Sequence, residues 1–305
     1  MKPLRVVFPQ GACDQKSRYL ILGFERLGIP VQIKAQSPKI GVTPFIVRYE
    51  DGRSVLCGHD IGCLQKNELS RGRGETHPWW EGKRDIFFFK VHASPTLLDP
   101  ERLIFPMPQS LGRNIFLDLI LPLRKWRTAR KPTLDIFGVL AAGGLRAEAC
   151  RIIKSGPWAA MVGIYKSRKG GTPAPPDVFI PGLEPEDYLR AMATAELALS
   201  LPSHGGEEGP WCSYRHVEAW ALGVPVLTIH PNAYHIFGEP GRGCWYGAAA
   251  DLSDLKAVAE RILADGYTPL DEAGRNAAAY FDAYFAPECH AEHVLHVIAS
   301  TLEKS

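Results

Sequence analysis

The first third of the chain alternates apolar and polar positions in a way that predicts a parallel sheet. Leu4–Phe8 is a continuous apolar run, which predicts a strand buried on both faces. A glycine-containing loop follows, and then apolar positions at helical spacing between Tyr19 and Leu27, ended by Gly28. A second strand begins at Val31. This strand–loop–helix–strand order is the usual first block of a parallel sheet.

The remainder of the first half predicts further strands and one long loop. In "PFIVRYEDGRSVLCG", Asp51 and Gly52 separate two alternating runs, which predicts a β-hairpin. "RDIFFFKVH" and "RLIFPMP" predict two more strands. The glycine-rich, basic segment "SRGRGETHPWWEGKR" lies between the hairpin and these strands and has no periodicity, which predicts a loop.

The second half repeats the alternation of strands and helices. "TLDIFGVLAAGGLRAEACRIIKSG" predicts a strand, a glycine turn and a helix, and strands and helices continue to alternate up to "VPVLTI" before three further helical segments. We interpret the basic stretch "LPLRKWRTARKP" as the connector between two halves. The expected architecture is therefore two Rossmann-like α/β domains, residues 1–131 and 132–305, whose mostly parallel sheets face each other across a cleft.

Composition narrows the class of protein. A chain of 305 residues fits two domains of ordinary size, and 46% hydrophobic residues are normal for a globular protein. No apolar run approaches the roughly 18–20 residues needed to cross a bilayer, and the N-terminus does not resemble a secretory signal. Seven cysteines at irregular spacings favour a reducing, cytoplasmic location. The cluster Cys57, His59, Asp60 and Cys63 lacks a second ligand pair, so buried thiols and a turn are favoured over a metal site.

Charge is distributed unevenly along the chain. Residues 1–134 hold 22 Lys and Arg against 12 Asp and Glu, whereas residues 135–305 hold 13 against 21. A net of +10 beside a net of −8 suggests that the first half binds something anionic. The alternative is a solvated basic surface that only keeps the protein soluble.

Two loops of the second half follow strands where a ligand is expected to bind. In open α/β sheets, ligands lie beyond the carboxyl ends of the strands. After the strand 134–140, Gly143 and Gly144 allow the backbone to approach a ligand closely, and Arg146 enters the next helix. After the strand 197–201, Gly205 and Gly206 form a pliable loop, and Ser213 is a candidate N-cap.

The helix that follows Ser213 carries one arginine and one glutamate in an apolar context. In "SYRHVEAWALG", the spacing of Tyr214, Val217 and Ala221 predicts a face toward the core. Arg215 and Glu218 then face the crevice, where a cation suits a diphosphate and a carboxylate suits the paired hydroxyls of a ribose. The alternative is a salt bridge between positions i and i+3 on the helix surface.

The run "EDYLRAMATAELALSLPSHGGEEGPWCSYRHVEAWALGVPVLTI" resembles the donor-binding half of GT-B glycosyltransferases. These proteins often have a small-x-Arg-x-x-Glu-Ala-x-Ala-x-Gly-x-Pro-Val segment, here "SYRHVEAWALGVPV". The resemblance implies a nucleotide-sugar donor, expected to be UDP-glucose. Glu218 would bind the ribose, Arg215 and Arg146 the diphosphate, and the Gly205–Gly206 loop the sugar or phosphates. Ser213, Tyr214, Gly143 and Gly144 complete the expected donor site.

The stereochemistry and the catalytic base stay open at this stage. Many retaining members have two glutamates separated by seven residues, but Pro210 stands at the first of these positions here. No metal cofactor is expected, because cationic side chains and helix N-termini can stabilise the departing diphosphate. If the reaction inverts, a base in the first domain must deprotonate the acceptor hydroxyl. Asp14 is the first candidate, with His92 and Asp60 in reserve, and each can instead be a turn-forming residue.

Cations interleaved with aromatic residues in the first half point to an anionic acceptor. The expected acceptor-binding residues are Lys16, Arg18, Arg71, Arg73, Trp79, Trp80 and Lys90. Such a combination suits a phosphate backbone with a stacked or flipped base, as in phage enzymes that glycosylate hydroxymethylated pyrimidines in duplex DNA. An anionic cell-surface glycan or a lipid-linked sugar is the competing acceptor. A sugar-nucleotide epimerase and a non-catalytic nucleic-acid-binding module are the alternatives from other classes.

Overall fold

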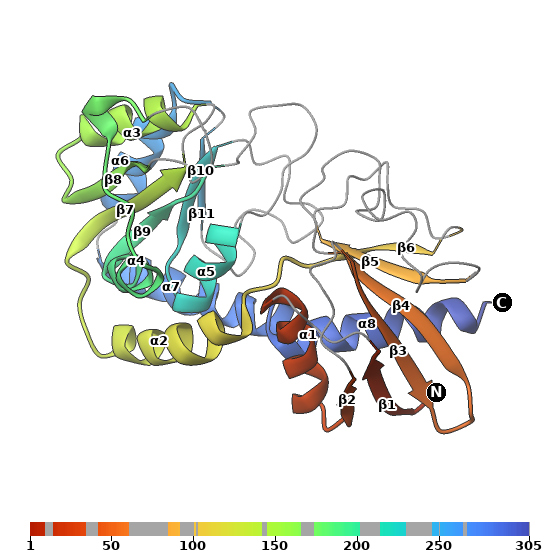
Figure 1. The fold of residues 1–305 in the computed structure, drawn as a ribbon. Coiled ribbons are helices and arrows are strands. Elements are labelled where there is room, and N and C mark those ends of the chain that lie inside the picture. The colour runs from red at the N-terminus through yellow and green to blue at the C-terminus, as the bar shows by residue number, and fades with distance from the viewer. Residues whose placement is uncertain are drawn as a thin grey trace. The chain divides into compact units, whose positions relative to one another are not determined.

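The computed structural model divides the chain into two compact units. Unit 1 comprises residues 1–114 and 283–305, and unit 2 comprises residues 115–282. The structure describes residues 1–9, 15–34, 42–60, 85–91, 101, 103–141, 145–165, 174–201, 214–229, 246–249, 251–264 and 267–304. Figure 1 shows the fold of the two units and the labels of their elements.

Unit 1 is built on a sheet in the order β2-β1-β3-β4-β5-β6. Its strands are β1 (Pro3–Phe8), β2 (Val31–Ile33), β3 (Val42–Tyr49), β4 (Ser54–Asp60), β5 (Phe87–Val91) and β6 (Ile104–Met107). The β1–β2, β4–β5 and β5–β6 pairs are parallel, whereas β3 runs antiparallel to both of its neighbours. The hairpin predicted at Asp51 and Gly52 is confirmed, because Arg48 pairs with Ser54 across a turn in which Gly52 has φ +89°.

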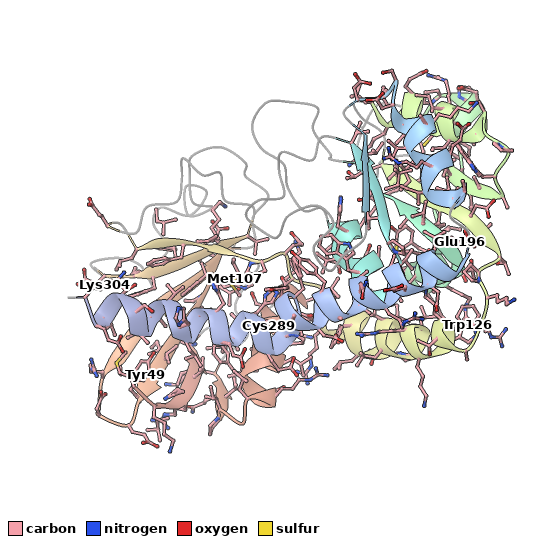
Figure 2. All side chains as sticks on the ribbon, turned by 180° about the vertical axis from the view of Figure 1, so that it is seen from behind. Tyr49, Met107, Trp126, Glu196, Cys289 and Lys304 are labelled. Atoms are coloured by element: carbon pink, nitrogen blue, oxygen red, sulfur yellow. The ribbon has the colours of Figure 1, made fainter. Side chains whose placement is uncertain are left out.

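Two helices from opposite ends of the chain complete unit 1. They are α1 (Gln15–Arg26) and α8 (Pro287–Leu302), and they pack against each other. Gly23 permits this contact, since a Cβ at that position would lie 1.9 Å from the carbonyl oxygen of Pro287. Figure 2 shows α8 running along the sheet from Cys289 to Lys304. The core joins Phe8, Phe24, Phe45 and Phe89 to apolar side chains of α8.

Unit 2 is a five-stranded, fully parallel sheet in the order β11-β10-β9-β7-β8. The strands are β7 (Leu134–Ala141), β8 (Ala160–Tyr165), β9 (Ala195–Leu199), β10 (Val226–Ile229) and β11 (Tyr246–Ala249). The helices are η2 (Ile115–Ile120, a π-helix), α2 (Leu121–Thr128), α3 (Arg146–Lys154), η3 (Pro176–Val178, a 3₁₀ turn), α4 (Pro185–Ala193), α5 (Tyr214–Leu222), α6 (Leu255–Ala264) and α7 (Tyr267–Tyr284).

The division between the units differs from the expected boundary between residues 131 and 132. The basic stretch expected to be a connector forms α2, which belongs to unit 2. Arg127 attaches it there, donating hydrogen bonds to the carbonyls of Ala193, Ala195 and Gly223. The last helix belongs to unit 1, because its apolar face completes the core over β5 and β6.

Candidate functional site

The order of the unit 2 strands places a topological switch point between β7 and β9. From β7 the chain crosses to β8 on one side, and β9, β10 and β11 then follow on the other side. In parallel α/β sheets, the carboxyl ends of the two strands at such a topological switch point, here β7 and β9, are the usual place for a ligand.

Arg146 ties the two strand ends at this point together. Its Nη1 donates to the carbonyl of Ala141, at the end of β7, and its Nη2 to the carbonyl of Leu201, after β9, each at 3.1 Å. The side chain is buried, with 4% of its surface exposed. Although the sequence predicted Arg146 as a diphosphate ligand, both terminal nitrogens are engaged with the backbone in this structure. Only Nε is left without a partner among the described residues.

A cavity of about 740 Å³ opens beside this switch point, entirely within unit 2. Its wall is formed by the ends of β7 and β8, the segment 182–185 that leads into α4, and the first turns of α4 and α5. A volume of this size is typical of small-molecule sites. Tyr214, Arg215 and Glu218, which the sequence predicted in the donor site, all line the cavity.

Helix α5 places Arg215 and Glu218 on the cavity wall, and Tyr214, which the spacing predicted on the core face, lines the cavity as well. Val217 and Ala221 are fully buried, so the opposite face of the helix is fixed against the core. Glu218 is only 6% exposed, and the Nε of Arg215 is buried without a hydrogen-bond partner in the described part of the chain. A salt bridge on the helix surface therefore does not describe this pair.

The burial of Glu218 changes its protonation. Removal from water raises the pKa of its carboxyl to about 8, and the nearby positive charge of Arg215 opposes part of this rise. Glu218 is therefore poised to change its charge near neutral pH. Perturbed carboxyl groups of this kind in a cavity are common at functional sites.

The two arginines of the site act on each other electrostatically. Burial and, next, the charge of Arg215 lower the pKa of Arg146 to about 10. Each guanidinium also has a buried Nε–H without a partner among the described residues. Two neighbouring like charges with unused donors favour the binding of an anion.

Several residues of the predicted site lie outside the described residues. In the predicted donor site these are Gly143, Gly144, Gly205, Gly206 and Ser213, and among the predicted base and acceptor residues they are Asp14, His92, Arg71, Arg73, Trp79 and Trp80. Their roles stay predictions.

In unit 1, Lys90 is not on a surface that could bind an acceptor, as its predicted role requires. It is part of β5, has no exposed side-chain surface, and donates from Nζ to Oδ2 of Asp60 at 3.0 Å. The parallel pairing of β4 with β5 sets Asp60 opposite Lys90 and explains this contact. The pair lies inside the sheet, so Lys90 is not part of a basic surface here, and Asp60 is occupied by an ion pair. Lys16 and Arg18 lie on the first turn of α1 and are partly exposed.

A buried polar cluster beside this pair was not predicted from the sequence. Ser17 donates to Oγ1 of Thr43 at 2.9 Å, and its Oγ lies 3.2 Å from Nδ1 of His59. The three side chains come from α1, β3 and β4, so only the fold brings them together. In the described part of the chain, no group of three His, Cys, Asp or Glu side chains is placed to hold a metal ion.

Tyr188 and Tyr165 of the unit 2 cavity were also missed. Both line it, Tyr165 at the end of β8 and Tyr188 on α4. In the sequence, Tyr188 stands within the amphipathic pattern "EDYLRAMA", where an aromatic residue predicts a core contact. Only the packing of α4 against α5 in the folded protein shows that Tyr188 also lines the cavity.

Comparisons with known proteins return similar folds but no family. No protein-family model matches the chain, and no curated protein matches it.

Among the described residues, no helix combines the length and apolar character of a membrane span.

Several solved glycosyltransferase structures are similar to the chain. AviGT4, a glycosyltransferase involved in avilamycin A biosynthesis, is 14% identical, with a TM-score of 0.48 over 97% of this chain and 92% of that one. A sucrose-phosphate synthase from Thermosynechococcus elongatus is 16% identical, with a TM-score of 0.47 over 71% of this chain. HepE of Anabaena, solved with UDP-glucose, is 13% identical, with a TM-score of 0.45 over 65% of this chain. The match spans only 59% of the synthase and 58% of HepE.

Proposed function

We propose that this chain is a glycosyltransferase that takes its sugar from a nucleotide-sugar bound in the cavity of unit 2. The observation that carries the proposal is the placement of Arg215 and Glu218. Both line a cavity of suitable size beside the switch point of a parallel sheet, and Glu218 is buried there.

The chemistry of a nucleotide-sugar matches these groups. The vicinal hydroxyls of a ribose donate hydrogen bonds, which the carboxyl of Glu218 can accept. The guanidinium of Arg215 and the N-terminus of α5 favour negative charge, and that charge grows on the diphosphate as the glycosidic bond breaks. Arg146 would fix the spacing of the two strand ends that it links and add positive charge beside them.

For the donor we propose a UDP-sugar, with UDP-glucose as the first compound to test. The basis is the resemblance of "SYRHVEAWALGVPV" to the donor-binding segment of GT-B glycosyltransferases. No metal ion is required in this proposal, because the arginines and the helix N-terminus supply the positive charge.

For the acceptor we propose a hydroxymethylated pyrimidine base in DNA. The excess of positive charge that supports an anionic acceptor is smaller in unit 1 than in the first half of the sequence. Unit 1 contains 18 Lys and Arg against 14 Asp and Glu, a net of +4, and unit 2 contains 17 against 19, a net of −2. The two units differ less in net charge than the two halves of the sequence do. The reason is that the cations of α2 belong to unit 2 and the acidic residues of α8 belong to unit 1. Lys16 and Arg18 are the described, partly exposed cations that support an anionic acceptor.

The decisive experiment mixes the protein with UDP-glucose and a duplex that contains hydroxymethylcytosine, and then weighs the nucleosides by mass spectrometry. The proposal expects a gain of one hexose on the modified base and none on unmodified DNA. Hydrolysis or binding of the donor without this gain would move the acceptor to a glycan or a lipid-linked sugar. Turnover of the donor to another nucleotide-sugar without an acceptor would indicate an epimerase, and DNA binding without donor binding would indicate a binding module.

The variant Glu218→Gln tests the residue on which the proposal rests. We expect its affinity for UDP-glucose to fall by about 100-fold, because a buried carboxyl that accepts from two hydroxyls is replaced by an amide. Glu186→Gln, on the exposed surface of α4, is the matched control and should bind as the wild type does. Unchanged binding by Glu218→Gln, measured by calorimetry, would contradict the proposed donor site.

A further inference from the structure

Tyr188 has the features of a ligand-binding residue although the sequence pattern assigned it to the core. It lies on α4 and lines the cavity together with Arg215 and Glu218. Its ring packs edge-on against that of Phe137, with the centroids 5.2 Å apart and the planes at 68°. Because Phe137 is only 1% exposed and lies within β7, this contact fixes the direction of the Tyr188 ring.

The hydroxyl at the end of this ring interacts with the side chains of Arg215 and Glu218 but completes no hydrogen bond of good geometry with the described residues. It is buried, and no described residue lies at hydrogen-bonding geometry to it. Arg215 and Glu218 are close, since the charges of both act on the pKa of Tyr188 and Arg215 also acts on it through hydrogen bonding. The Nε–H of Arg215 is unused as well, so two buried polar atoms without partners belong to neighbouring side chains of one cavity wall.

Unused buried polar atoms destabilise a folded protein, and most native structures avoid them. Where they border a cavity, a ligand that hydrogen-bonds to them removes the penalty. This explains why a fold would keep the Tyr188 hydroxyl where phenylalanine would pack equally well against Phe137.

We propose that Tyr188 is a specificity-determining residue of the donor site, whose hydroxyl donates a hydrogen bond to an oxygen of the ribose–diphosphate portion of the nucleotide-sugar. This inference rests on the proposed function of the cavity. Arg215 can only donate, and Glu218 can only accept once it is ionised, whereas a phenol can do either. Burial and the charge of Glu218 raise the pKa of Tyr188 far above its usual value, so the hydroxyl keeps its proton and is available as a donor.

The variant Tyr188→Phe tests this assignment with two measurements. It keeps the ring and its contact with Phe137 and removes only the hydroxyl. We expect the affinity for UDP-glucose and for UDP to fall by the same factor, about five- to tenfold. In the absence of ligand, the thermal midpoint should stay close to that of the wild type, because the hydroxyl completes no hydrogen bond of good geometry with the described residues.

Tyr284→Phe is the matched control, since Tyr284 is 59% exposed and belongs to unit 1. It should leave the affinity unchanged, because Tyr284 does not line the cavity. A lower midpoint of Tyr188→Phe with unchanged affinity would show that the hydroxyl only supports the protein, and would overturn the inference. A loss of affinity for UDP-glucose but not for UDP would also overturn it, because the contact would then involve the sugar.

The failure of this inference is distinguishable from the failure of the proposed function. If wild-type protein binds UDP-glucose and Glu218→Gln does not, while Tyr188→Phe binds as well as the wild type, only the role of Tyr188 is wrong. If the wild-type protein binds neither UDP-glucose nor UDP, the proposed donor site itself is wrong.

Discussion

Each unit places one basic and one acidic side chain near the carboxyl ends of parallel strands, but with opposite results. In unit 1, Lys90 and Asp60 form a closed ion pair of 3.0 Å with no exposed side-chain surface. In unit 2, Arg215 and Glu218 line a cavity, and each responds electrostatically to the other and to Tyr188. A buried pair that satisfies itself supports a fold, whereas buried groups left with unused hydrogen-bonding capacity prepare a site for a ligand.

The largest expected effect comes from breaking the closed pair. Lys90→Met removes the ammonium that faces the buried carboxylate of Asp60, and breaking a buried ion pair in this way costs about 3–5 kcal/mol of stability. Faster amide hydrogen exchange in β4 and β5 would reveal it. The double variant Lys90→Met with Asp60→Leu should recover most of the loss, because no unpaired charge remains. If Lys90→Met alone keeps the exchange of the wild type, the closed pair does not support unit 1.

An intermediate effect is expected from pH acting on Arg215 and Glu218, the pair that lines the cavity of unit 2. Burial raises the pKa of Glu218 in the folded protein to about 8, from an ordinary value of 4.5. Between these two values the folded state holds a proton that the unfolded state has released. The stability that Glu218 contributes is therefore present below about pH 4.5 and is lost as the pH rises to about 8.

Thermal midpoints of the ligand-free wild type and of Glu218→Gln across this range measure the effect. The wild type should lose stability relative to the variant as the pH rises, because glutamine does not titrate. If the midpoints of the two proteins change with pH in parallel, the carboxyl of Glu218 has an ordinary pKa. Burial would then not distinguish Glu218 from an exposed carboxyl.

The smallest effect is expected from a pair that neither unit buries. Arg190 and Glu186 form an i, i+4 ion pair on α4, with 51% and 59% of their side chains exposed. Solvent screens such a pair, so Arg190→Ala should change the free energy of unfolding by at most about 0.5 kcal/mol. If the chemical-denaturation midpoint of Arg190→Ala lies well below that of the wild type, the exposure of an ion pair does not determine how much it contributes to stability.

The sequence predicted what depends on neighbouring residues. The apolar runs of β1, β7 and β10 and the turn at Gly52 are encoded locally, and the helical spacing of α5 was enough to turn Glu218 toward the cavity. The order of strand, loop and helix also predicted the edge of the sheet at which the cavity lies.

The sequence did not predict what depends on distant residues. Lys90 stands near a loop in the sequence, and its burial requires a partner in β4, thirty residues earlier. The membership of α8 in unit 1 depends on Gly23, whose missing side chain allows Pro287 to approach. The hydroxyl of Tyr188 acquires its environment only when α4 packs beside α5.

The discontinuity of unit 1 has a consequence for how the protein is made. During synthesis, residues 1–114 leave the ribosome first, but the helix that completes their core is α8, which follows unit 2. Unit 2 is one continuous segment and can finish folding before α8 exists. At roughly 5–20 residues per second, the nascent sheet of unit 1 waits on the order of ten to thirty seconds for its missing helix. Phe24, Phe89 and their neighbours are then the apolar surface that a chaperone would meet on the growing chain.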